Sequence, residues 1–221
     1  MRKTVLLALA IALVPACLFA VDGQVLINQS TVMAGGGFPY RISLPGSYKL
    51  SGNLTMTTTV GGNIGGIDVA IAIASSQVTL DLNGFTIFII NNFAFPSHQY
   101  YAIAELGSFS QITIRNGSIV ATSASLLNTG LVGPTSIYLQ TSTINRIEGV
   151  TFRFDDNTIH AANGLLAGKG SIVRDVVAPE NNSFIICPSI LFQTLGVRPD
   201  DFKSNPLECL QMLATTVNQF K

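Results

Sequence analysis

Four short segments of this sequence share one pattern and recur at a nearly constant interval. Each contains a glycine that follows a polar or charged residue and precedes β-prone residues: Gly52, Gly84, Gly117 and Gly149. Successive glycines are 32, 33 and 32 residues apart. A fixed period of this length is typical of a solenoid, in which each repeat buries its apolar face by stacking on its neighbours. The period therefore favours a stacked architecture.

Short runs of alternating apolar and polar residues lie between these glycines, for example over 78–82 and 111–115. Such alternation is typical of strands with one buried face. Three strands and their corners fit each repeat, and parallel pairing would place equivalent residues of neighbouring repeats ~4.8 Å apart. We therefore expect an all-β, three-faced parallel solenoid of about five coils over residues 61–187.

The repeated glycines and the residues before them predict the corners of this solenoid. We expect Gly84, Gly117 and Gly149 to stack in register at one corner. Asn83 and Asn116 precede two of them, and we expect both side chains to point inward and form a ladder of amide hydrogen bonds. Asn116-Gly-Ser is also a glycosylation sequence, an alternative that requires a eukaryotic secretory route.

One pair of opposite charges occupies matching positions in successive repeats. Asp81 follows Leu80, and Arg115 follows Ile114. The two charged side chains should face the same side one repeat apart, so we expect a cross-strand ion pair. If the pair is exposed, it contributes less than ~1 kcal/mol.

The first 20 residues have the layout of a secretory signal peptide. Arg2 and Lys3 precede an apolar run, Val5 to Val14, that is too short to span a membrane. The short, doubly basic leader favours a bacterial protein that is secreted to the periplasm or the cell exterior. The sequence before Cys17 loosely matches a lipoprotein box, but its proline is a poor residue there, so we expect no lipid anchor.

The charge of the remaining chain bears on its partners. After the leader, 10 basic and 12 acidic residues remain, without a basic cluster. A protein that binds nucleic acid carries a basic patch that neutralises phosphates. We therefore expect no nucleic-acid partner.

Different segments flank the predicted stack. Residues 21–60 contain strand signals, and we expect them to cover its N-terminal end. Within residues 188–221, Asn205-Pro-Leu-Glu208 predicts the start of a helix that covers the C-terminal end, where strand edges would otherwise be open. Cys187 and Cys209 are the cysteines left after the leader, and an even count in an exported chain predicts a disulfide between them. The alternative is two buried free thiols.

Two segments carry a resemblance to a known family: Val78-Thr-Leu-Asp-Leu-Asn-Gly-Phe-Thr-Ile and Ile112-Thr-Ile-Arg-Asn-Gly-Ser-Ile. Over roughly residues 40–180, the chain resembles the right-handed parallel β-helix, or pectate-lyase-like, superfamily, and in particular secreted bacterial β-helix repeat proteins. The resemblance implies a right-handed parallel β-helix. It implies little about activity, because many members have no assigned one.

Asp155, Asp156 and His160 are the candidates for catalysis, by comparison with β-helical pectin hydrolases, which use carboxylates as acid and base. The family pattern is incomplete, because no histidine lies between two glycines and Glu148 stands where that pattern has a lysine. Adjacent aspartates on a strand would face opposite sides, so a turn is the simpler interpretation. A lyase would need a calcium-binding carboxylate cluster, which we do not find. We therefore expect no catalytic residue, metal site or cofactor.

The loop over 91–101 is the largest interruption of the repeat and contains candidate sugar-binding residues: Phe93, Phe95, His98, Tyr100 and Tyr101. Insertions in solenoids often form the binding face, and aromatic rings suit stacking on sugars. The alternative is that these residues pack the loop onto the coil beneath it, and the absence of tryptophan counts against a dedicated carbohydrate site. We expect a secreted, non-catalytic protein of cell-surface interaction or glycan binding, with a polysaccharide or cell-surface glycan as partner. A small polysaccharide lyase or glycoside hydrolase is the alternative.

Overall fold

The computed structural model describes residues 23–58, 62–64, 66–91, 99–123, 135–139, 141–154, 163–168, 170–177, 185–186 and 190–192 of the 221-residue chain. Strands dominate these segments, and their one helix is α2, Gln29–Ala34. Every pairing between the strands is parallel. The prediction of an all-β chain with parallel sheets is confirmed.

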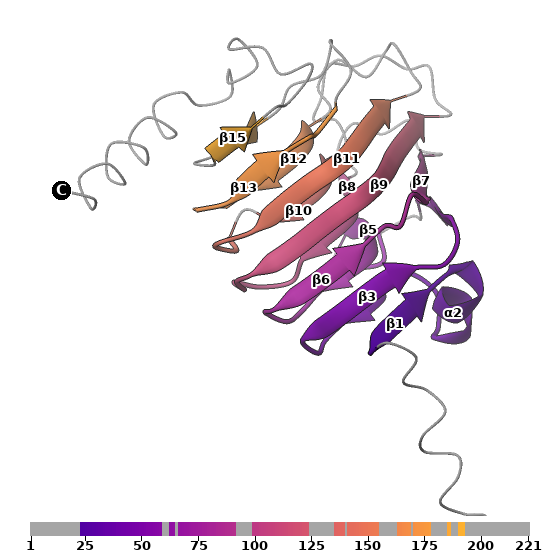
Figure 1. Cartoon of the computed structure of the whole chain (residues 1–221). Coiled ribbons are helices and arrows are strands. Elements are labelled where there is room, and N and C mark those ends of the chain that lie inside the picture. Colours follow the sequence, from indigo (N-terminus) through magenta and orange to yellow (C-terminus); the bar gives the residue numbers. More distant parts are fainter. Residues whose placement is uncertain are drawn as a thin grey trace, which may run out of the picture.

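The described strands form two sheets (Figure 1). Seven strands of the nine-stranded sheet lie in the order β1 (Gln24–Ile27), β3 (Gly46–Leu50), β6 (Val78–Asp81), β9 (Ile112–Ser123), β11 (Arg146–Phe154), β13 (Ile172–Arg174) and β15 (Ile190–Phe192). Beside them, β4 (Leu54–Thr57) pairs with β7 (Thr86–Asn91), which also pairs with β9. The six-stranded sheet has the order β14 (Ile185–Ile186), β12 (Asn163–Ala167), β10 (Thr135–Leu139), β8 (Gln99–Glu105), β5 (Ile67–Ile73) and β2 (Tyr40–Ile42).

Each strand pairs with the strand at the equivalent place in the next repeat. In the larger sheet Leu80 of β6 lies opposite Ile114 of β9, and in the smaller sheet Ile71 of β5 lies opposite Ile103 of β8. The chain passes from one sheet to the other between these pairings, so successive repeats lie side by side in Figure 1. The sequence period therefore reflects the distance along the chain from one strand to the strand with which it pairs.

One apolar core contains side chains of both sheets. In the larger sheet a fully buried column runs across four strands: Leu80, Ile114, Ile147 and Val173. A matching column in the smaller sheet consists of Ile71, Ile103, Ile137 and Leu165. Burying one such side chain contributes roughly 1.5–3 kcal/mol, so these columns are a main source of stability.

The helix α2 was not anticipated from the sequence. Asn28 is its N-cap and forms a capping box with Thr31, in which each side chain accepts a hydrogen bond from the other residue's backbone N–H, both at 2.9 Å. Val32 is its one buried residue and belongs to the main core. A helix of six residues is too short to show a helical period, which explains why the sequence pattern did not reveal it.

Residues with left-handed backbone conformations form two columns across the larger sheet. The first column lies one or two positions before the paired residues of β6, β9, β11 and β13: Gln77 (φ 57°), Gln111 (φ 60°), Ile144 (φ 57°) and Gly170 (φ 75°). The second column directly follows the paired residues Arg115, Glu148 and Arg174: Asn116 (φ 59°), Gly149 (φ 60°) and Asp175 (φ 51°). These columns are the repeated bends of the chain.

The prediction that Gly84, Gly117 and Gly149 stack in register is therefore wrong. Gly117 lies opposite Val150, and Gly149 lies opposite Asn116. Paired residues of β9 and β11 are 33 residues apart, as Gly117 and Val150 are, whereas Gly117 and Gly149 are 32 apart, so Gly149 falls one position short. Gly84 is displaced for another reason: four residues, 82–85, lie between Asp81 and Thr86, whereas two, 116–117, lie between their partners Arg115 and Ser118. Equal spacing of the glycines therefore does not mean equal position in the register.

The predicted inward ladder of Asn83 and Asn116 is also wrong, since both side chains are exposed. The Nδ2 of Asn83 donates to the carbonyl of Leu50 at 3.2 Å, and the Nδ2 of Asn116 donates to Oδ1 of Asp81 at 3.3 Å. Nor does Asn116-Gly117 end a strand, because β9 continues through it to Ser123. A left-handed residue bends this strand without ending its pairing.

Several predictions lie outside the described residues. These are the signal peptide over 1–20, the lipid-box Cys17, the C-terminal helix and the disulfide between Cys187 and Cys209. The strand β15 lies beyond residue 187, where the sequence placed the end of the stack, so parallel pairing continues to Phe192. In the described part of the chain, no helix is long and apolar enough to cross a membrane.

Candidate functional site

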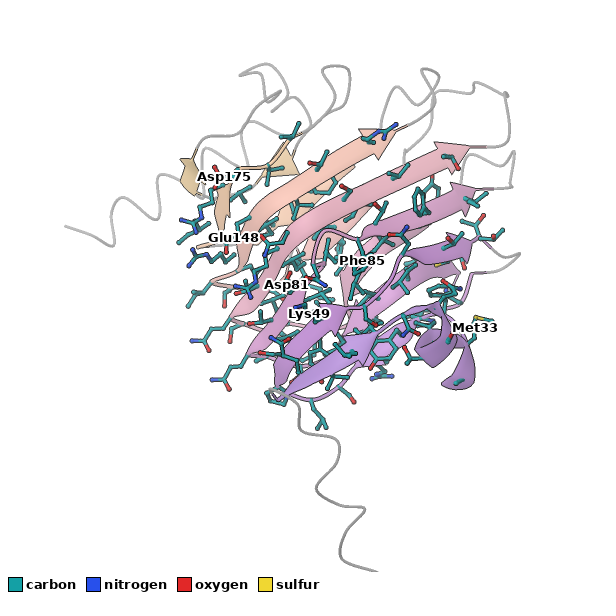
Figure 2. All side chains as sticks on the ribbon, turned by 45° about the vertical axis from the view of Figure 1, so that its right-hand side comes forward. Met33, Lys49, Asp81, Phe85, Glu148 and Asp175 are labelled. Carbon is teal, nitrogen blue, oxygen red and sulfur yellow. The ribbon has the colours of Figure 1, made fainter. Side chains whose placement is uncertain are left out.

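A row of alternating charges crosses the outer face of the larger sheet. The strand register places five residues side by side in adjacent strands: Lys49, Asp81, Arg115, Glu148 and Arg174. The residue that precedes each of them in its strand is buried, so the row faces away from the core. Figure 2 shows Lys49, Asp81 and Glu148 on this sheet. Opposite charges in adjacent strands attract, so this order stabilises the register.

The predicted ion pair between Asp81 and Arg115 is confirmed. Nη2 and Nε of Arg115 both lie 3.0 Å from Oδ2 of Asp81. The Asp81 carboxylate also accepts a hydrogen bond from the backbone N–H of Asn83 at 2.8 Å, and a further one from Asn116. It therefore fixes the bend that follows β6 as well as the pairing of β6 with β9.

A second charged group consists of Arg146, Glu148 and Arg174. Nε of Arg146 lies 2.7 Å from Oε2 of Glu148, and Nη2 of Arg174 lies 2.7 Å from the same oxygen. Burial alone would raise the pKa of Glu148, but the hydrogen bonds and positive charges of Arg146 and Arg174 outweigh it and lower that pKa below its ordinary value. Glu148 is therefore a firmly ionised carboxylate.

Part of this charged group could be predicted from the sequence. Arg146 and Glu148 are two positions apart, which places both on one face of a strand. Arg174 lies only 26 residues beyond Glu148, a shorter interval than the repeat period, so its register was not predictable. The row beside these charges contains the hydroxyls of Ser47, Thr79 and Thr113.

Tyrosines occupy the two faces of the smaller sheet. Tyr100 is 3% exposed and belongs to the main core, so its predicted role in sugar binding is not supported by its position. Tyr101 points to the opposite face, where its ring centroid lies 5.1 Å from that of Tyr138 with the planes tilted by 30°. Both rings are half-buried and pack on Val69, Ala72 and Ala104. Burial and then the neighbouring Tyr138 raise the pKa of Tyr101.

A buried carboxylate joins two turns near the end of β8. Glu105 is 7% exposed, and its Oε1 accepts hydrogen bonds from the backbone N–H of Thr141 at 2.5 Å and from the Thr141 hydroxyl at 2.6 Å. Its Oε2 accepts a hydrogen bond from the hydroxyl of Ser142. Because these donors satisfy both oxygens, Glu105 holds the segment after β10 against β8 and has a structural role.

The remaining candidate residues from the sequence lie outside the described residues. They are Phe93, Phe95 and His98 of the loop, and Asp155, Asp156 and His160 of the proposed catalytic group. Over the described ranges, no group of three or more histidine, cysteine, aspartate or glutamate side chains is arranged to hold a metal ion. The structure thus brings together Tyr101 with Tyr138, and Asp81 with Arg115.

Comparisons with known proteins gave no relative. No family model matches the chain, and no curated protein and no solved structure matches it.

Proposed function

We propose that the chain is a secreted, non-catalytic right-handed parallel β-helix that binds a glycan at a cell surface. The proposed helix has three faces and about five coils, and a C-terminal helix covers its end. The in-register pairing of strands one repeat apart supports this proposal. Right-handedness is supported because crossovers between parallel strands of one sheet are right-handed in ~98% of proteins.

The tyrosine pair is the observation that carries the proposed binding function. Tyr101 and Tyr138 come from adjacent strands and lie on the outer face of the smaller sheet, away from the main core. An aromatic ring offers a rigid apolar face with a polar hydroxyl at its edge, which suits a sugar ring that also has an apolar face and a hydroxyl rim. The rings belong to an apolar cluster on this face that also contains Val69, Ala72 and Ala104, with Ile64, Ile67 and Leu106 packed against it.

The state of the two carboxylates in the charged row, Asp81 and Glu148, supports a non-catalytic surface there. A glycosidase needs one carboxylic acid that stays protonated until it donates to the leaving group, and such acids have raised pKa values. Glu148 has a lowered pKa because Arg146 and Arg174 bind it, and Asp81 is bound by Arg115. These groups suit a stable charged surface better than proton transfer.

Affinity electrophoresis in polysaccharide-containing gels tests this function. The wild type is expected to migrate more slowly in at least one polysaccharide without releasing reducing sugar. Tyr101→Leu and Tyr138→Leu should migrate as in a gel without polysaccharide, whereas the matched variants Tyr101→Phe and Tyr138→Phe, which keep the ring, should still be slowed. Release of reducing sugar, or slowing that survives both leucine substitutions, would refute the proposal.

A further inference from the structure

The charged row of the larger sheet ends in a group of two arginines and one glutamate, with the exposed Asp175 next to Arg174 in the chain. Arg146 and Arg174 both bind the single oxygen Oε2 of Glu148, so these three side chains have a net charge of about +1. The neighbouring pair of Asp81 and Arg115 is neutral by comparison. The excess charge is accessible, since the side chains of Arg146 and Arg174 are 45% and 43% exposed.

Both arginines keep hydrogen-bond donors that Glu148 does not use. A guanidinium group has five N–H donors in a planar fork. Arg146 directs its Nε at Glu148, and Arg174 directs its Nε and Nη2. Among the contacts of the described residues, none occupies the Nη groups of Arg146 or the Nη1 of Arg174.

The shared carboxylate also orders the two side chains before any ligand arrives. Arg146 lies opposite Ile172 in the register, so Arg174 is its diagonal neighbour across β11 and β13. Such diagonal positions are roughly 7–8 Å apart, which long side chains can bridge. Because Glu148 already restricts both arginines, a ligand would lose less side-chain entropy on binding.

We propose that Arg146 and Arg174 form a binding site for a phosphate or sulfate group, with Glu148 as the residue that positions them. The planar fork of arginine matches the oxygens of such groups and forms charge-assisted, often bidentate, hydrogen bonds. Thr113 lies opposite Arg146 in β9 on the same face and adds a hydroxyl donor beside the site. This site is on the larger sheet, so it does not depend on sugar binding at Tyr101 and Tyr138.

Binding of defined anions to the purified protein tests this site. Calorimetric titrations would use inorganic phosphate and sulfate, and sedimentation would use vesicles of phosphatidylglycerol or of phosphatidylcholine. Arg146→Gln and Arg174→Gln should each weaken binding about tenfold, which is the loss of one strong charge-assisted contact. The control Arg153→Gln removes the same charge from an exposed position of β11 and should change affinity less than about twofold.

The arms of the experiment separate the sources of the anion. Saturable binding of phosphate or sulfate ions that both variants weaken would support a site for free anions. Binding confined to phosphatidylglycerol vesicles and weakened in the same way would support the same chemistry on a lipid headgroup. The proposal is overturned if no arm shows saturable binding, or if Arg153→Gln loses as much affinity as Arg146→Gln. An anion-dependent rise in unfolding temperature that is absent from both variants is a second expected result.

Discussion

Gly117→Ala should destabilise the protein more than Gly84→Ala, although both glycines occupy the same Asn-Gly sequence. A β-carbon on Gly117 would lie 2.3 Å from Cβ of Leu82 and 2.7 Å from the carbonyl oxygen of Phe85. The carbonyl belongs to the backbone and cannot rotate away, so the strand or the preceding turn must shift. Overpacking of this kind costs up to ~3 kcal/mol.

Gly84 offers a matched comparison because an alanine there would be strained by its backbone conformation and not by a steric clash. Its φ is +78°, and no atom lies within 4 Å of an added β-carbon. Alanine there meets only the left-handed backbone penalty, about 1 kcal/mol. In equilibrium denaturation with an unchanged m-value, Gly117→Ala should therefore lower the free energy of unfolding by about 2 kcal/mol more than Gly84→Ala does. Equal losses, or a larger loss for Gly84→Ala, would refute the inferred contact between β9 and the preceding turn.

Three further predictions concern backbone strain, a buried amide and pH. Ile144→Gly should raise the free energy of unfolding by about 1 kcal/mol in denaturant titrations, because a β-branched residue at φ 57° is strained and its side chain is 62% exposed. Asn145→Leu should raise the unfolding temperature, because the Asn145 side chain is 1% exposed and its amide atoms have no hydrogen-bond partner within the described structure; a lower temperature would mean that the amide is satisfied. The lowered pKa of Glu148 adds stability that is complete above its ordinary value of 4.5 and is lost as pH falls through the folded value, so Glu148→Gln should flatten the pH dependence of unfolding in that acidic range.

The features that the sequence predicted well are those set by alternation within a strand. Leu80 and Ile114 are buried and Asp81 and Arg115 are paired outside, because side chains alternate between the faces of a strand and the repeat aligns the two strands. Alternation was enough to predict which side chains are buried, and together with the repeat it predicted the parallel pairing and one ion pair. It needs no knowledge of how long each turn is.

The features that were not predicted from the sequence depend on the length of each turn and on residues other than glycine that adopt a left-handed conformation. The longer turn at 82–85 displaces Gly84, and Asn116 takes the left-handed position opposite Gly149. The pairing of Tyr101 with Tyr138 joins residues 37 apart, which the glycine period does not specify. Equal spacing in the sequence thus indicated where the repeats lie, but it did not indicate which residues of neighbouring repeats lie opposite each other.

Intrinsic tyrosine fluorescence tests the proposed glycan site most directly, because the chain contains five tyrosines and no tryptophan. Titration of the wild type with a panel of soluble oligosaccharides should give a saturable change for at least one of them. That change should disappear in Tyr138→Leu and persist in Tyr40→Phe, which alters a tyrosine of β2 outside the Tyr101–Tyr138 pair. Unchanged fluorescence with every oligosaccharide, or the same change in Tyr138→Leu as in the wild type, would contradict the account.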